Sequence, residues 1–86
     1  MQQINLTVTN SSSTASGTPT GGNYLVVHNQ DASASLAFTL DGSTPVVNDN
    51  GVTLAPETSF SLGQWSASAV KLISSANSQK ATLLCG

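Results

Sequence analysis

Charge is scarce in this sequence. Its charged residues make up 7% of 86 positions and give a net charge of −2, against about 25% charged residues in typical soluble domains. A nucleic-acid partner is excluded because binding to phosphates requires clusters of Lys and Arg, and only two lysines are present. A weakly charged surface also repels its own copies weakly, which favours a protein that packs against neighbours.

Cysteine, histidine and aromatic residues are equally few. Cys85 is the single cysteine, so no internal disulfide can form, and His28 is the single histidine. The aromatic residues number four: Tyr24, Phe38, Phe60 and Trp65. A single domain of this length buries a modest core, and small domains commonly gain stability from disulfides, metals or oligomers. Self-association is therefore the supplement that we expect.

Long apolar runs are missing as well. No stretch approaches the roughly 20 residues that cross a bilayer, and the first residues lack the basic and apolar parts of a secretory signal. We expect a small complete product made in a cytosol, with no membrane partner.

Residues 1–22 are predicted to form an N-terminal arm and linker, and residues 23–86 the body. Residues 2–9 alternate, with Ile4, Leu6 and Val8 on one face of a strand. Residues 10–22 are rich in Ser, Thr, Gly and Pro and contain no large apolar side chain, which predicts a flexible linker. The arm could pair with its own sheet, with a sister subunit or with another protein.

The body is predicted to be all-β: a small antiparallel β-sandwich or barrel of about six to eight short strands. Expected strands cover residues 24–29, 35–40, 52–54, 58–62, 67–74 and 80–85, with a short edge segment at 45–47. Residues 67–74 also fit a helical turn, but Val and Ile favour a strand. Asp41-Gly42 and Asn50-Gly51 are typical of tight turns. Pro45 and Pro56 indicate strand starts, edges or corners.

The strand at 35–40 carries the clearest alternation in the chain. Leu36, Phe38 and Leu40 lie two residues apart and are predicted to face the core. Ala37 and Thr39 are predicted to face away from it.

No catalytic, cofactor or metal site is expected. His28 would need a nucleophile and an orienting carboxylate to act as a base, and the Gly-x-Ser-x-Gly motif is absent, so we expect it to point outward or lie at an interface. Asn48, Asp49, Asn50 and Gly51 suggest calcium ligands, but they lack the spacing and closing Glu of a calcium loop and are typical turn residues.

Trp65 and Cys85 each have two interpretations. Trp65 follows a turn and is expected either to plug one end of the core or to take part in an interface. Cys85 alternates with Ala81 and Leu83 and is expected to be a buried structural thiol. A reactive or intermolecular Cys85 would need an electropositive neighbourhood that the sequence does not supply.

Three segments together resemble small virion structural proteins of tailed bacteriophages. They are Leu40-Asp41-Gly42-Ser43-Thr44-Pro45, Gly51-Val52-Thr53-Leu54-Ala55-Pro56 and Ala69-Val70-Lys71-Leu72-Ile73-Ser74. The resemblance spans residues 23–84 and departs at Glu57, where a Gly often follows the proline. It implies a capsid decoration or cement protein, a β-sandwich that assembles as a homotrimer and resides in the virion after synthesis in the host cytoplasm.

The resemblance implies a non-enzymatic role with the major capsid protein or another virion protein as partner. Because a tethered strand can extend a neighbour's sheet, Ile4, Leu6, Val8 and Trp65 are the predicted partner contacts. The alternative is a tail or spike module that recognises a host-surface glycan, for which the polar surface and Trp65 are suitable. An enzyme is disfavoured because clustered carboxylates, paired histidines and a Gly-rich phosphate loop are absent.

Overall fold

Within residues 2–11, 14–15 and 20–86, which the computed structural model describes, the chain consists of β-strands and connecting segments with no helix. The named strands pair only in antiparallel fashion. The predicted all-β antiparallel fold is thus confirmed. Over these same residues, no helix is long and apolar enough to span a membrane.

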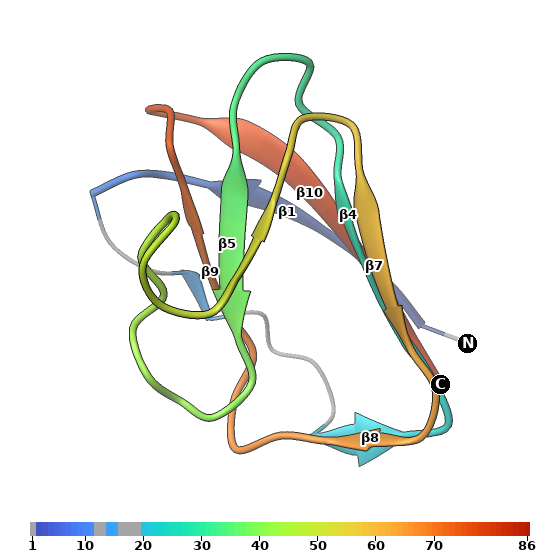
Figure 1. Ribbon diagram of the computed structural model, residues 1–86. Helices are drawn as coiled ribbons and strands as arrows, with labels where there is room; N and C mark the ends of the chain where they lie inside the picture. The colour runs from blue at the N-terminus through green and yellow to red at the C-terminus, as the bar shows by residue number, and fades with distance from the viewer. Residues whose placement is uncertain (1, 12–13, 16–19) are drawn as a thin grey trace.

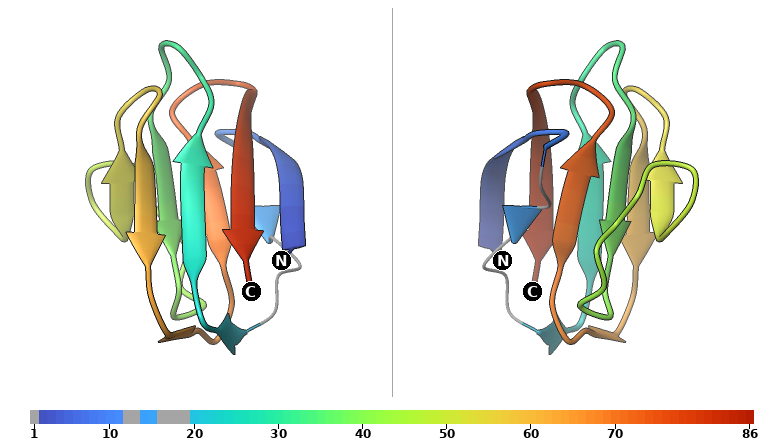
Figure 2. Two further views of the ribbon diagram at one scale, coloured as in Figure 1. Left: turned by 90° about the vertical axis from the view of Figure 1, so that its right-hand side faces the viewer. Right: turned by 90° about the vertical axis from the view of Figure 1, so that its left-hand side faces the viewer.

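Two four-stranded sheets form the two layers of a sandwich (Figures 1 and 2). Sheet A has the order β1 (Gln2–Val8), β10 (Gln79–Cys85), β4 (Leu25–Asn29) and β7 (Ser59–Leu62). Sheet B has the order β2 (Thr14–Ala15), β9 (Lys71–Ser74), β5 (Leu36–Thr39) and β6 (Val52–Leu54). A short ribbon of β3 (Gly21–Gly22) and β8 (Trp65–Ser66) lies at one end.

The first strand of the chain pairs with the last. Its register runs without a bulge from Gln2 opposite Cys85 to Val8 opposite Gln79, so β1 is the edge strand of sheet A beside the C-terminal strand (Figure 2, left). Of the three arrangements open for the arm, the structure has pairing within its own chain.

Alternation divides sheet A into an inner and an outer face. Neighbouring strands bring Ile4, Leu83 and Val27 into one inner row, and these rows meet side chains of sheet B in a single core. The buried members of that core are Val8, Leu25, Val27, Leu36, Phe38, Leu54, Trp65, Val70, Leu72, Ala81, Leu83 and Cys85. The rings of Phe38 and Phe60 cross the gap between the sheets with centroids 5.5 Å apart.

Asn29 closes one end of the core with its buried side chain. Its amide nitrogen donates to the carbonyls of Ala34 at 2.9 Å, Ala55 at 3.2 Å and Leu54 at 3.3 Å. Its amide oxygen accepts from Gln79 Nε2 at 2.8 Å and from a backbone N–H at 3.0 Å. The loop after β4, the β6–β7 connection and the first residue of β10 are therefore joined at one side chain. The sequence pattern predicts a polar turn from Asn29 onward; in the structure Asn29 ends β4 and is fully buried.

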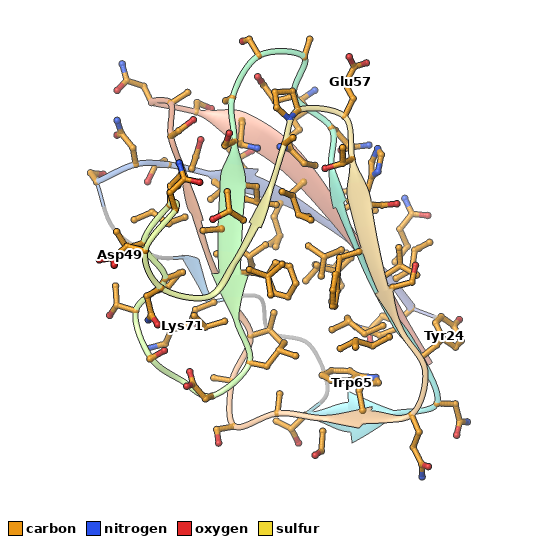
Figure 3. The ribbon with its side chains drawn as sticks, in the orientation of Figure 1. Tyr24, Asp49, Glu57, Trp65 and Lys71 are labelled. Carbon is orange, nitrogen blue, oxygen red and sulfur yellow. The ribbon has the colours of Figure 1, made fainter. Side chains whose placement is uncertain are left out.

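Trp65 covers the opposite end of the core. Figure 3 shows its ring across the end of the sandwich, above the β3–β8 ribbon, and only 7% of the residue is exposed. Nε1 is buried and has no hydrogen-bond partner among the described residues. This is the position expected of a plug.

The connection between β5 and β6 differs from the predicted tight turn. Residues 40–51 form a long loop that lies over the outer face of sheet B (Figure 2, right). Thr39 Oγ1 donates to the carbonyl of Ser43 at 2.6 Å, and Pro45 is fully buried. Ala37 and Thr39, predicted to face away from the core, are consequently buried on the second face of β5.

Most predicted strands are present, with shifted ends. Residues 67–74 form a strand only at 71–74, and the earlier part makes a single bridge between Ala69 and Asp41. The segment at 45–47 makes one bridge, from Val46 to Asn50. Gly42 and Gly51 have φ of 83° and 94°, which is the backbone region that the turn prediction required. A Cβ at Gly51 would overlap the carbonyl oxygen of Phe38.

The predicted linker over residues 10–22 falls in part on residues outside the described ranges, namely 12–13 and 16–19. Two of its described parts belong to sheet structure, since Thr14 pairs with Leu72 and Gly22 pairs with Trp65.

Candidate functional site

The predicted partner contacts occupy two separate places. Ile4 and Leu6 are partly buried against the core, and Val8 is fully buried. All three point inward from β1, whereas Trp65 belongs to the β3–β8 ribbon at the other end of the core. The inward side chains are thus engaged within the molecule, and what β1 offers to a partner is its backbone edge and its outward side chains.

Backbone hydrogen bonds between β10 and β4 show toward which neighbouring strand the N–H and C=O groups of each β10 residue point. Tyr24 and Gly86 exchange both bonds, at 3.0 and 3.2 Å, and the N–H of Gln30 donates to Lys80 at 3.1 Å. Because bonded pairs recur at every second residue of an antiparallel ladder, the even-numbered residues of β10 bond toward β4. The odd-numbered residues therefore bond toward β1.

The same alternation shows which groups of β1 face outward. The odd residues of β10 pair with the even residues of β1, so Gln3, Asn5 and Thr7 direct their N–H and C=O groups to the other edge of β1, which has no neighbouring strand among the described residues. The backbone of Thr9, the next odd residue, also bonds away from β10: its carbonyl accepts a hydrogen bond from the N–H of Ser74 in sheet B at 3.0 Å. Gln3, Asn5 and Thr7 thus form an edge of backbone donors and acceptors.

The outer side of sheet A carries the second feature, which we call the sheet A face. Its centre is an apolar pair, Val26 opposite Leu84, and both are partly exposed. The surrounding side chains are mostly uncharged and polar: Gln3, Asn5, Thr7, His28, Ser59, Ser61, Lys80 and Thr82. An apolar centre with a polar rim is the usual composition of a protein–protein interface.

His28 belongs to this face, in the row with Thr82 and Ser59. It points outward from β4, as expected from the sequence. No group of three or more His, Cys, Asp or Glu side chains able to hold a metal ion occurs in the described residues.

A recess of about 550 Å³ opens between β6 and β7. Its floor includes Phe38, Phe60 and Leu62, and its rim includes Asp41 and Asn50. The rim groups are engaged in the loop itself, since Asp41 accepts from Ser43 Oγ at 2.6 Å and Asn50 Nδ2 donates to Thr44 at 2.8 Å. Asp41 and Asn50 therefore already have hydrogen-bond partners within the loop.

A smaller polar recess of about 350 Å³ borders the sheet A face. Asn5, Leu6, Thr7, Gln30 and Lys80 line it. It contains amide, hydroxyl and ammonium groups that can bond to a polar ligand.

The turn at Asn48–Gly51 has the geometry of an ordinary tight turn. The N–H groups of Asp49 and Asn50 both donate to the carbonyl of Val46, at 3.0 and 2.9 Å, and Asn48 has φ of 62°. Asp49 points away from the molecule in Figure 3. Cys85, at the other end of the chain, is free and buried, as predicted.

Hydrogen bonds within their own loops lower the pKa values of two aspartates. Backbone N–H groups of Ser33 and Ala34, together with the Ser33 hydroxyl, bond to Asp31 and hold the pKa of its carboxyl below the usual value. The Ser43 hydroxyl and N–H lower the pKa of Asp41 in the same way. Both groups stabilise turns.

The sequence pattern pointed to the inward residues of β1 and not to the outward ones. In the sequence, Gln3, Asn5 and Thr7 are only the polar positions between the apolar ones. Alternation alone does not show which backbone groups face the edge of the sheet, because that depends on which strand pairs with β1.

A scan against protein-family models, a search of curated proteins and a search of solved structures each found no match to this chain. A functional assignment therefore depends on the residues and their geometry.

Proposed function

We propose that this protein is a non-enzymatic structural component of a phage particle that decorates or cements the capsid through protein–protein contacts. The observation that carries the proposal is the sheet A face, with its apolar centre at Val26 and Leu84 and its nearly uncharged rim. The phage assignment rests on the resemblance of three sequence segments to small virion structural proteins. A virion location and the major capsid protein as partner belong to the same proposal.

The physical chemistry of the surface supports a role in a crowded assembly. The sheet A face is formed by the paired strands of sheet A, so a partner would bind it with little loss of conformational entropy. Lys80 is the single charged residue of the face, and docking therefore requires almost no desolvation of ions. Such a surface is suited to short-range fit against a neighbouring protein.

Co-sedimentation with purified capsids of the phage that encodes the chain tests the proposal. The wild type should pellet with capsids, and Thr82→Glu should weaken binding at least tenfold because it puts a carboxylate beside the apolar centre of the face. Val46→Glu is the matched control, since Val46 is 44% exposed in the loop over sheet B, and it should bind like the wild type. Failure of the wild type to bind capsids would contradict the proposal.

The alternative function is a glycan-recognition module of a tail or spike. The polar recess at Asn5, Thr7, Gln30 and Lys80 favours it, whereas Trp65, the residue expected to stack on a sugar, lies in the core. A glycan-array signal that Lys80→Ala removes, with no capsid binding by the wild type, would favour this alternative.

A further inference from the structure

We propose that two copies of this chain associate by antiparallel pairing of their β1 strands around a two-fold axis at Asn5, which joins both sheets A into one continuous sheet. The partner is thus a second copy of the chain, and the surface is the open edge of β1. This inference gives the proposed function an oligomeric state, a dimer in place of the homotrimer that the resemblance implies, and its evidence comes from β1 alone.

The outward backbone groups select one register. Gln3, Asn5 and Thr7 face the edge, and in a two-fold antiparallel pair the numbers of opposing residues have a constant sum. A sum of ten places Asn5 opposite Asn5 of the second copy, and Gln3 opposite Thr7 in both directions. Every outward residue is then in a bonded pair. Sums of eight or twelve pair fewer of these three residues.

The inner side chains fit the same register. With Asn5 on the axis, Ile4 of one copy lies opposite Leu6 of the other, at the closer, non-hydrogen-bonded spacing. Ile4 and Leu6 are only partly buried in the single chain, because β1 is the last strand of the sheet. Pairing would cover them with each other and extend the core across the axis.

Charges do not oppose this arrangement. Strand β1 contains no charged residue. Lys80 lies opposite Thr7, and Thr7 lies opposite Gln3 of the second copy, so the cross-strand row that contains each Lys80 continues to an uncharged residue. The rows of the two Lys80 residues are separated by four positions along the strand, or roughly 13 Å.

Strand β1 also lacks the features that protect edge strands in monomers, namely charge, proline, a bulge or short length. The other edge strand of sheet A, β7, has four residues. Only Ser59 and Ser61 direct their backbone groups outward, because the residues that alternate with them bond toward β4. In sheet B, the edge strands β2 and β6 have two and three residues. The longest open edge of the described strands is therefore β1.

Cysteine cross-linking tests the register directly. Asn5→Cys should form a disulfide-linked dimer on mild oxidation, because bonded antiparallel pairs have Cα atoms about 5.5 Å apart, within disulfide reach. Gln3→Cys alone should remain uncross-linked, yet a mixture of Gln3→Cys with Thr7→Cys should form a mixed dimer. The wild type is the background control, since Cys85 is buried.

Solution mass completes the test on the intact chain. The wild type should have twice the 8.7 kDa chain mass, and Asn5→Lys should be a folded monomer by mass and circular dichroism, because two like charges would meet on the axis. Ser61→Lys, the same change at the exposed β7 edge, should stay dimeric. A monomeric or trimeric wild type, or equal cross-linking of Gln3→Cys and Asn5→Cys, would overturn the pairing. Capsid binding by such a monomer or trimer would leave the proposed function intact.

Discussion

At the scale of single residues, Asn29 shows how a polar side chain can organise an apolar core. Its amide has bonds on both the nitrogen and the oxygen, and Gln79 extends the chain of bonds to the hydroxyl of Ser74. A buried amide without partners would cost free energy, whereas this one joins two loops and the start of β10. We therefore interpret Asn29 as a structural residue rather than a site residue.

Truncation of Asn29 should be costly. Asn29→Ala removes the partner of Gln79 Nε2 and leaves carbonyls of two loops without their donor, so we expect a loss of about 2–4 kcal/mol in the free energy of unfolding. Urea denaturation followed by circular dichroism measures it. Asn77→Ala, at an exposed turn position, should change the free energy by less than about 0.5 kcal/mol. Equal losses in the two variants would show that the network is dispensable.

Trp65 is the second residue whose place changes its interpretation. The sequence left both a core plug and an interface role open, because an aromatic residue after a turn suits either. Its buried ring fills the end of the core, and the indole N–H has no partner in the described part of the chain. What Trp65 supplies here is apolar volume.

At the scale of elements, the period-two alternation predicted the strands well because each has one face toward the core. The alternation could not show that β1 pairs with β10, since a strand's pattern contains its inward face and not its neighbour. It placed Ala37 and Thr39 on the face of β5 away from the core, but it did not show that they are buried there, because residues 40–51 fold back over sheet B. The sheet A face could be foreseen as polar positions only, and its two-dimensional arrangement required the register.

The loop after β4 should make stability depend on pH. The pKa of Asp31 is lower in the folded state, so its ionised form stabilises the fold above the unfolded value near 3.9, and this contribution is lost as the pH falls through the folded pKa. Asp31→Asn should therefore weaken the decline of thermal stability below about pH 4. Melting temperatures from pH 2 to 7 measure the effect.

Asp49→Asn is the control for that titration. Asp49 is exposed at the tip of a turn, and its replacement should leave the acid decline unchanged. An acid decline of the same size in Asp31→Asn and the wild type would contradict the assignment to Asp31.

At the scale of the whole molecule, scarcity of charge is the property that links fold and proposed role. The carboxylates of Asp49 and Glu57 project from the loops in Figure 3, while the sheet A face has a single charge at Lys80. Contacts made by such a face depend on shape, apolar burial and neutral hydrogen bonds. Salt therefore has few charges to screen on this face.

Self-association should accordingly be insensitive to ionic strength. We expect the dissociation constant of the dimer to change less than about threefold between 0.05 and 0.5 M NaCl, because no ion pair crosses the β1 edge. Sedimentation equilibrium at several salt concentrations measures it. A tenfold weakening at high salt would indicate charged contacts elsewhere on the surface.

The pairing of the first strand with the last has a kinetic consequence during synthesis. Strand β1 is synthesised before the other strands of the sandwich, and its partner β10 is synthesised after them. Sheet A therefore cannot be completed until β10 has been synthesised, and β1 lacks its ladder partner for that whole interval. Non-local pairing of this kind slows folding and exposes strand edges to other chains. Nascent chains on one messenger would thus meet while β1 is still unpaired. Until β10 has been made, β1 is the strand most at risk of pairing with another chain.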